Sequence, residues 1–123
     1  MAALAPPEDG LAFELAAIRR GLQRELRYQR DGYANHTLSR APYLRVVLVV
    51  VRRGLRFAEH HANEAVSIQV MSGCVRVHLP ERTVELTAGQ LLVLRAGSGH
   101  DVEARIDSAF VLTLGSPTEG ATP

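Results

Sequence analysis

The C-terminal two-thirds of the chain consists of short apolar segments separated by turn residues, and this pattern restricts the fold more than any other feature. From Leu44 onward, eight segments have the length and β-branched composition of strands. These segments are residues 44–52, 55–61, 65–71, 74–79, 83–86, 90–94, 100–106 and 109–114. Turn residues such as Arg53-Gly54 and Ser72-Gly73 separate them. Many short strands joined by tight turns predict an antiparallel β-sandwich or barrel.

Upstream of these strands the spacing of apolar residues changes to that of a helix. The apolar stripe consists of Leu11, Leu15, Ile18, Leu22 and Leu26, at spacings of four, three, four and four. Such spacing places the side chains on one face and predicts an amphipathic helix over residues 10–28, with Asp9 as its N-cap. A polar connection is expected to follow this helix.

The length of 123 residues suits a single domain. We expect a flexible leader over residues 1–9 and a helix with its connection over residues 10–42. The barrel is expected over residues 43–115, followed by a loose tail over residues 116–123, which lacks apolar anchors.

Alternation within the strands predicts which side chains face the interior. In residues 100–106, His100 shares its face with Val102 and Ala104, so His100 is expected to point inward. His78 alternates with Val77 and is expected to face solvent. Residues 46–51 are apolar on both faces, which implies that the N-terminal helix or a partner subunit covers their outer side.

The composition excludes several classes of function. All 14 basic residues are arginines and 13 acids oppose them, leaving a net charge of +1 that gives no general drive toward nucleic acid or an anionic membrane. Without lysine, neither Schiff-base chemistry nor a P-loop is available. The longest apolar run, residues 46–51, is too short to span a membrane. With Cys74 as the sole cysteine and no recognisable secretion signal, we expect a cytoplasmic protein.

Residues 89–104 carry a motif that resembles the second motif of the cupins, G(X)5PXG(X)2H(X)3N. Gly89, Gly97 and His100 occupy its glycine and histidine positions, whereas Arg95 replaces the proline and Ala104 the asparagine. The segments 67–73 and 100–104 also resemble those of short bacterial cupins of undefined activity. The resemblance implies a mainly β fold, an antiparallel double-stranded β-helix or jelly-roll barrel, with one N-terminal amphipathic helix.

The first cupin motif, G(X)5HXH(X)3,4E(X)6G, is met only in part. Gly54, His60 and Gly73 fit its spacing, but Ala62 stands in place of the second histidine and Val66 in place of the glutamate. If the register shifts by one residue, His61 takes the second histidine position and Glu59 replaces the first. The spacing from Gly54 favours His60, whereas the alternation of Leu55 and Phe57 favours His61; we prefer His60.

The resemblance implies a site inside the barrel, which we place at His60, Val66 and His100. If a metal such as Fe, Mn, Ni or Zn is bound, His60 and His100 are the candidate ligands, with Glu64 or His61 as a third. Because the usual ligand set is depleted, we expect no tightly bound metal.

Two functions remain open at this point. The leading hypothesis is a non-catalytic or metal-poor module that binds a small molecule, and the alternative is a metal-dependent enzyme, dioxygenase- or isomerase-like, that uses His60 and His100. A homodimer is expected, because cupins are commonly dimers and because the apolar stripe and residues 46–51 offer surfaces to bury. Neither nucleic acid nor a membrane is expected as a partner.

Overall fold

The computed structural model describes residues 10–59 and 63–116, so the predicted leader, His60, His61 and most of the predicted tail lie outside the described residues. Within these ranges, two helices precede nine strands. They are α1 (Leu15–Arg24), α2 (Leu26–Asp31), β1 (Tyr33–Ala41), β2 (Leu44–Val51), β3 (Arg56–Glu59), β4 (Ala65–Ser72), β5 (Cys74–His78), β6 (Thr83–Thr87), β7 (Leu91–Leu94), β8 (His100–Ala104) and β9 (Ser108–Gly115).

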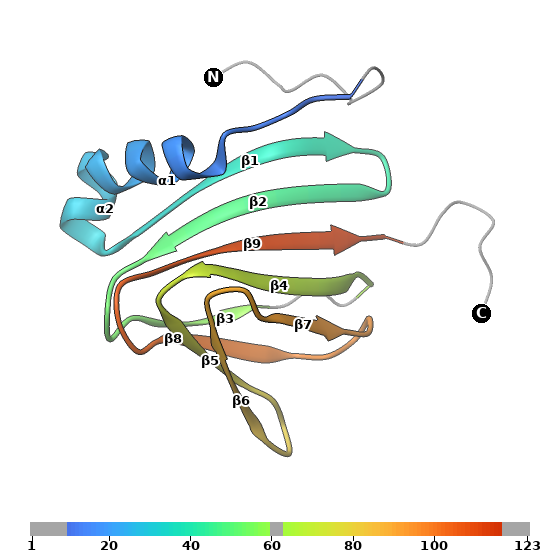
Figure 1. Ribbon diagram of the computed structural model, residues 1–123. Coiled ribbons are helices and arrows are strands. Elements are labelled where there is room, and N and C mark those ends of the chain that lie inside the picture. Colours follow the sequence, from blue (N-terminus) through green and yellow to red (C-terminus); the bar gives the residue numbers. More distant parts are fainter. Residues whose placement is uncertain (1–9, 60–62, 117–123) are drawn as a thin grey trace.

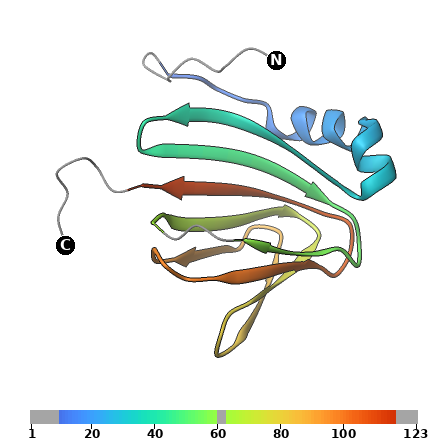
Figure 2. The same ribbon diagram turned by 180° about the vertical axis from the view of Figure 1, so that it is seen from behind.

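The strands form two antiparallel sheets that face each other (Figure 1). One has five strands in the order β1-β2-β9-β4-β7, and the other has four in the order β3-β8-β5-β6. Figure 2 shows the two sheets from behind. Along the chain, the strands change from one sheet to the other between β2 and β3, β3 and β4, β4 and β5, β6 and β7, β7 and β8, and β8 and β9. This is the jelly-roll arrangement expected from the sequence.

Alternation along the strands builds the core between the two sheets. Val47, Val49 and Val51 of β2 point inward and meet Val75 and Val77 of β5. Because successive side chains of a strand point to opposite faces, the intervening residues face outward. The prediction that His100 points inward and His78 outward is confirmed, since His100 is buried while His78 forms side-chain contacts on the outer face of the four-stranded sheet.

All eight strands expected from the sequence are present, with ends that differ by no more than two residues. A ninth strand, β1, lies in the region expected to be a polar connection and was not predicted. β1 pairs with β2 from Tyr33↔Val51 to Ala41↔Leu44, with a bulge between Thr37 and Ser39. The bulge interrupts the alternation by which a strand is recognised, and Asn35 is a residue type that strands disfavour. The paired sheet structure therefore begins at Tyr33 rather than near residue 43.

The single helix expected over residues 10–28 is wrong in its bounds and continuity. α1 begins at Leu15 with Glu14 as N-cap, and the chain becomes extended at Glu25, where ψ is 142°, before α2 begins. Asp9, the expected N-cap, lies outside the described residues. The break turns Tyr28 into the core and leaves Leu26, which the stripe had placed there, exposed.

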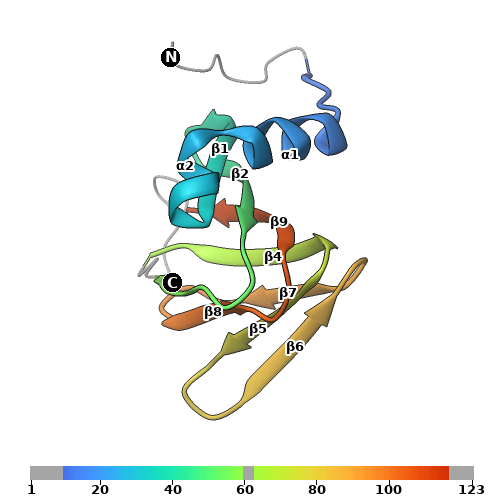
Figure 3. The ribbon, with the colours of Figure 1, turned by 90° about the vertical axis from the view of Figure 1, so that its left-hand side faces the viewer.

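The helices cover the outer face of β1 and β2, as Figure 3 shows. Leu22 and Tyr28 pack with Ala34, Leu48 and Val50 in a second cluster on this outer face. The expectation that the helix covers the doubly apolar strand is therefore confirmed. Among the described residues, no helix is long and apolar enough to cross a membrane.

Candidate functional site

One end of the barrel carries the residue that the cupin-like motif singled out, and we call it the His100 end. It is formed by the β1–β2 turn, the beginning of β4, the end of β9 and the β7–β8 loop, which lie together on the right in Figure 1. The pairing of Ala65 with Gly115 and of Val66 with Leu94 places these segments side by side in the five-stranded sheet. His100 begins β8 in the opposite sheet, paired with Glu59 of β3.

The imidazole of His100 is only partly satisfied by hydrogen bonds. Its Nδ1 lies 3.4 Å from the backbone oxygen of Ser98, to which it donates, and its Nε2 is buried with no hydrogen-bond partner among the described residues. A buried polar atom without a hydrogen-bond partner costs free energy, and this nitrogen can still accept or donate one hydrogen bond. Val66, the second predicted site residue, is buried in the core.

A cavity of about 200 Å³ runs along the inner face of the five-stranded sheet at the β1 side. Its walls are Tyr33, Asn35 and Thr37 of β1, Arg45, Val47 and Val49 of β2, and Leu112 and Leu114 of β9. These side chains share one face because they alternate along three neighbouring strands. The β1 wall is polar, whereas the other two walls are apolar apart from Arg45.

Tyr33 closes one part of this cavity. Its ring packs edge-on against Phe57 of β3, with ring centroids 5.2 Å apart and an angle of 76° between the planes. Asn35 donates from Nδ2 to the Tyr33 hydroxyl at 3.1 Å. The edge-on ring contact joins the two sheets, and the hydrogen bond fixes the side chains of the polar wall. Defined contacts therefore hold this side of the cavity in place.

Arg45 provides the positive charge of the cavity. Its Nη2 donates to Oε1 of Glu64 at 3.4 Å, and its Nε is buried with no hydrogen-bond partner among the described residues. The Ser116 hydroxyl donates to the other oxygen, Oε2, of Glu64 at 3.1 Å. Glu64, a candidate third metal ligand in the sequence analysis, is thus engaged by Arg45 and Ser116.

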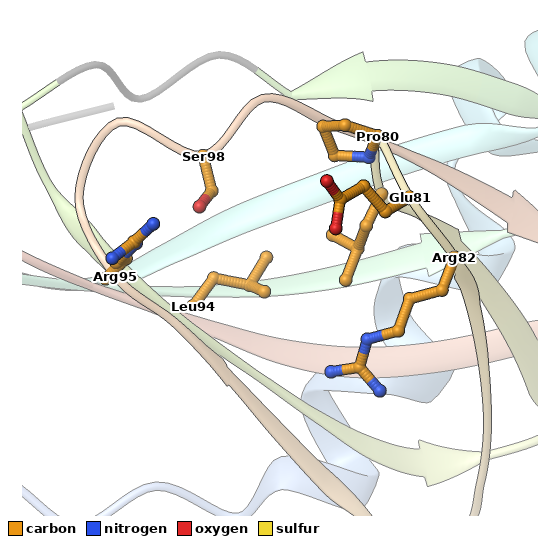
Figure 4. Close-up of a pocket in the computed structure, with 7 residues that line it drawn as sticks. Pro80, Glu81, Arg82, Leu94, Arg95 and Ser98 are labelled. Atoms are coloured by element: carbon orange, nitrogen blue, oxygen red, sulfur yellow. The ribbon is translucent and has the colours of Figure 1, made fainter.

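A second cavity, of about 400 Å³, lies between the β5–β6 turn and the β7–β8 loop. Figure 4 shows Arg95 and Ser98 on one side of it and Pro80, Glu81 and Arg82 on the other. Apart from Leu79, Leu94 and Ser98, its lining residues are exposed. The Glu81 carboxylate opposes the charge of the arginines. The lining of this cavity therefore differs less in polarity from the protein around it than the polar groups of the inner cavity differ from the apolar core.

The structure brings together only some of the predicted site residues. His100 and Val66 face the interior, but His60 and His61 lie outside the described residues, so the choice between them stays a prediction. Within residues 10–59 and 63–116, no group of three histidine, cysteine, aspartate or glutamate side chains could hold a metal ion. Tyr33, Asn35 and Thr37 were not predicted as site residues, because only their alternate spacing marks them in the sequence, and neither was Arg45.

The comparisons with known proteins agree with the fold. The family model for the AraC-like ligand binding domain matches residues 46–114. A search of curated proteins finds no match. Three solved structures with similar folds each share less than 25% sequence identity with this chain, so these similarities bear on the fold alone.

Three solved structures illustrate this likeness. KdgF from a Halomonas species is 20% identical with a TM-score of 0.66, over 74% of this chain and 84% of that chain. The SPY1581 protein of unknown function from Streptococcus pyogenes is 18% identical with a TM-score of 0.68, over 97% and 98%. A salicylate 1,2-dioxygenase mutant from Pseudoaminobacter salicylatoxidans is 17% identical with a TM-score of 0.73, over 84% of this chain but 34% of that chain. Since the family model covers more than half of the sequence and the fold is that of a cupin, the protein belongs to the AraC-like ligand-binding domain family.

Proposed function

We propose that the protein is a non-catalytic module that binds a small molecule between its two sheets. The observation that carries this proposal is the inner cavity, in which polar side chains of β1 and the guanidinium of Arg45 face the interior of an otherwise apolar barrel. A mostly apolar concave site with a few converging polar groups is the usual form of a ligand pocket. The family to which the chain belongs, whose model is that of a ligand-binding domain, supports the same function.

His60, Val66 and His100 remain the proposed ligand-binding residues at the His100 end. The buried Nε2 of His100 supports this, because a ligand acceptor or donor would satisfy it. Val66 contributes an apolar wall. The part of the proposal that concerns His60 depends on the sequence motif alone.

A thermal-shift screen of metabolites against the purified chain tests this function. We expect at least one compound to raise the melting temperature, because a ligand that binds only the folded state stabilises it. The Val47→Phe variant, which fills the inner cavity, should lose that rise. The matched Val93→Phe variant on the outer face of β7 should keep it. A screen without a hit, or a hit that survives Val47→Phe, would contradict the proposal.

A second candidate function is a metal-dependent enzyme, which is favoured by the Nε2 of His100, a nitrogen without a hydrogen-bond partner in the part of the chain that the structure describes. His100 fits a metal ligand, but Glu64 could serve as one only by giving up contacts with Arg45 and Ser116. A bound metal would supply Lewis-acid or redox chemistry. Elemental analysis separates the two functions: stoichiometric metal that is lost in His100→Ala would overturn the non-catalytic proposal, whereas metal well below stoichiometry would count against the enzyme.

A homodimer is proposed as well, although the two apolar surfaces from which the sequence predicted it pack against each other within the chain. The structure leaves other apolar side chains exposed, among them Leu91 and Val93 on the edge strand β7. An apolar edge strand is a common site of pairing between copies. The proposed compartment is the cytoplasm, and the proposed partners include neither nucleic acid nor a membrane.

A further inference from the structure

We propose that the ligand of the inner cavity carries a carboxylate group, which binds the guanidinium of Arg45 in place of Glu64. This inference rests on the proposed function and names the chemical class of its ligand. It is independent of the cupin-like histidines, because it depends only on Arg45, Glu64 and the walls of the inner cavity.

The position of Arg45 in β2 is unusual for an arginine. It shares the inward face with Val47, Val49 and Val51, all of which are buried in the core. A partly buried guanidinium loses hydration and needs hydrogen bonds from its surroundings in return. An inward arginine at the end of an apolar row therefore calls for an anionic partner.

The hydrogen bonds of Arg45 are incomplete. Its contact with Glu64 is long, at 3.4 Å, and uses Nη2 alone, while the neighbouring Nε is buried and has no partner within residues 10–59 and 63–116. A guanidinium presents these nitrogens as a rigid fork that matches the two oxygens of one carboxylate. The side of the fork that includes Nε thus lacks an acceptor, which a ligand carboxylate that displaces Glu64 can supply.

Glu64 does not use both of its oxygens on this fork. Oε1 contacts Arg45, whereas Oε2 accepts a hydrogen bond from Ser116. The carboxylate is therefore shared between Arg45 and at least one other partner, Ser116, and does not form the paired, bidentate contact with the guanidinium. A ligand carboxylate can make that contact, and it would compete with Glu64 for the same guanidinium.

The remaining walls limit the rest of the ligand. The cavity measures about 200 Å³, below the roughly 300–1,000 Å³ of sites for drug-sized ligands. Asn35 and Thr37 line it with side chains that can donate to and accept from hydroxyl groups. A small hydroxycarboxylic acid, of the size of glycolate or glycerate, combines these requirements.

NMR titration of the 15N-labelled full-length chain tests the inference with D-glycerate and glycolate as probes and glycerol as the neutral counterpart. We expect both acids to shift amide resonances of β1 and β2 saturably, and glycerol to bind about tenfold more weakly or worse. Arg45→Gln should weaken the acids at least about tenfold, the effect of losing a charge-assisted contact. Arg95→Gln, which removes a charge from the second cavity, should leave their affinity unchanged.

The Glu64→Gln variant tests most directly whether the ligand carboxylate competes with Glu64. It removes the competing carboxylate while it keeps the shape of the side chain, so the acids should bind several-fold more tightly and glycerol should be unaffected. Weaker binding of the acids in Glu64→Gln, or equal binding of acids and glycerol, would overturn the inference. If neutral compounds from the metabolite screen occupy the cavity instead, the proposed function stands and only the ligand class is wrong. A screen in which nothing binds would remove both.

Discussion

Gly73 lies in the turn between β4 and β5, where its φ of 89° falls in the left-handed region that favours glycine. A Cβ added there would also lie 2.7 Å from the Cα of Ser108, closer than real contacts allow. The Ser108 hydroxyl in turn accepts a hydrogen bond from the Cys74 backbone at 3.0 Å. The second glycine of the first cupin motif is thus required by both conformation and close approach.

Replacement of this glycine should be costly. We expect Gly73→Ala to lower the free energy of unfolding by about 2–4 kcal/mol, because backbone strain and overpacking add. Gly54→Ala is the matched control, since Gly54 has the same φ of 89° but nothing within 4 Å of an added Cβ. It should cost only about 1–2 kcal/mol. Urea denaturation of both variants measures the difference, and equal losses would show that the contact with Ser108 is unimportant.

Among the residues of the outer face, His78 joins two neighbouring strands. Its Nε2 lies 2.8 Å from Oε1 of Glu103 on β8, and its Nδ1 lies 3.1 Å from the Thr83 hydroxyl on β6. Because an ionised carboxylate only accepts, Nε2 carries the hydrogen of this contact. The hydrogen bond from His78 holds the pKa of Glu103 below its ordinary value, with a smaller contribution from the charges of nearby arginines.

A lowered carboxyl pKa makes stability depend on acid. The contribution of Glu103 is present above its ordinary pKa and is lost as pH falls through the lowered pKa of the folded state. Between pH of about 5 and about 3, the wild-type chain should therefore lose stability more steeply than Glu103→Gln. Urea midpoints measured across this range test the difference. In a His78→Ala background the two slopes should converge, and persistence of the difference there would exclude His78 as the cause.

Among the secondary-structure elements, α1 and α2 show that residues alike in sequence differ in structure. Leu22 and Leu26 belong to the same predicted stripe, yet Leu22 is 3% exposed and Leu26 75% exposed. Leu22→Ala should lower the free energy of unfolding by about 2–4 kcal/mol, since it leaves a cavity between α1 and β2. Leu26→Ala should change it by no more than about 0.5 kcal/mol. Thermal or urea unfolding of the two variants measures both changes in the free energy of unfolding. Similar losses would mean that the helix break at Glu25 is absent in solution.

The break in the helix and the missed strand have a common reason. No glycine or proline marks Glu25, and the chain turns there because Tyr28 packs into the outer cluster, with the Arg52 guanidinium 5.2 Å from the centre of its ring. β1 likewise gains its pairing from β2 and not from its own composition. Contacts between distant segments override weak local preferences, and a single sequence does not display them.

At the scale of the whole molecule, the proposed homodimer makes a prediction about β7. Val93 is 66% exposed on this edge strand, and Val93→Arg should convert the dimer to a monomer, because a charge on an apolar edge opposes pairing. Ile106→Arg is the matched control, since Ile106 is 50% exposed in the β8–β9 turn, and it should leave the dimer intact. Light scattering coupled to gel filtration measures both. A wild-type monomer, or dissociation by Ile106→Arg alone, would contradict a dimer through β7.

From the sequence alone, alternation and turn residues specified the strands from Leu44 onward and the inward direction of His100, because each segment carries these local properties in its own residues. The jelly-roll class was implied by the resemblance to the cupin motifs. The edge strand β1, the break at Glu25 and the contact of Arg45, which lines the inner cavity, with Glu64 became visible only in the folded chain. These features depend on which segments become neighbours. Arg45 and Glu64 are 19 positions apart in the sequence and meet only because β2 and β4 flank β9 in one sheet.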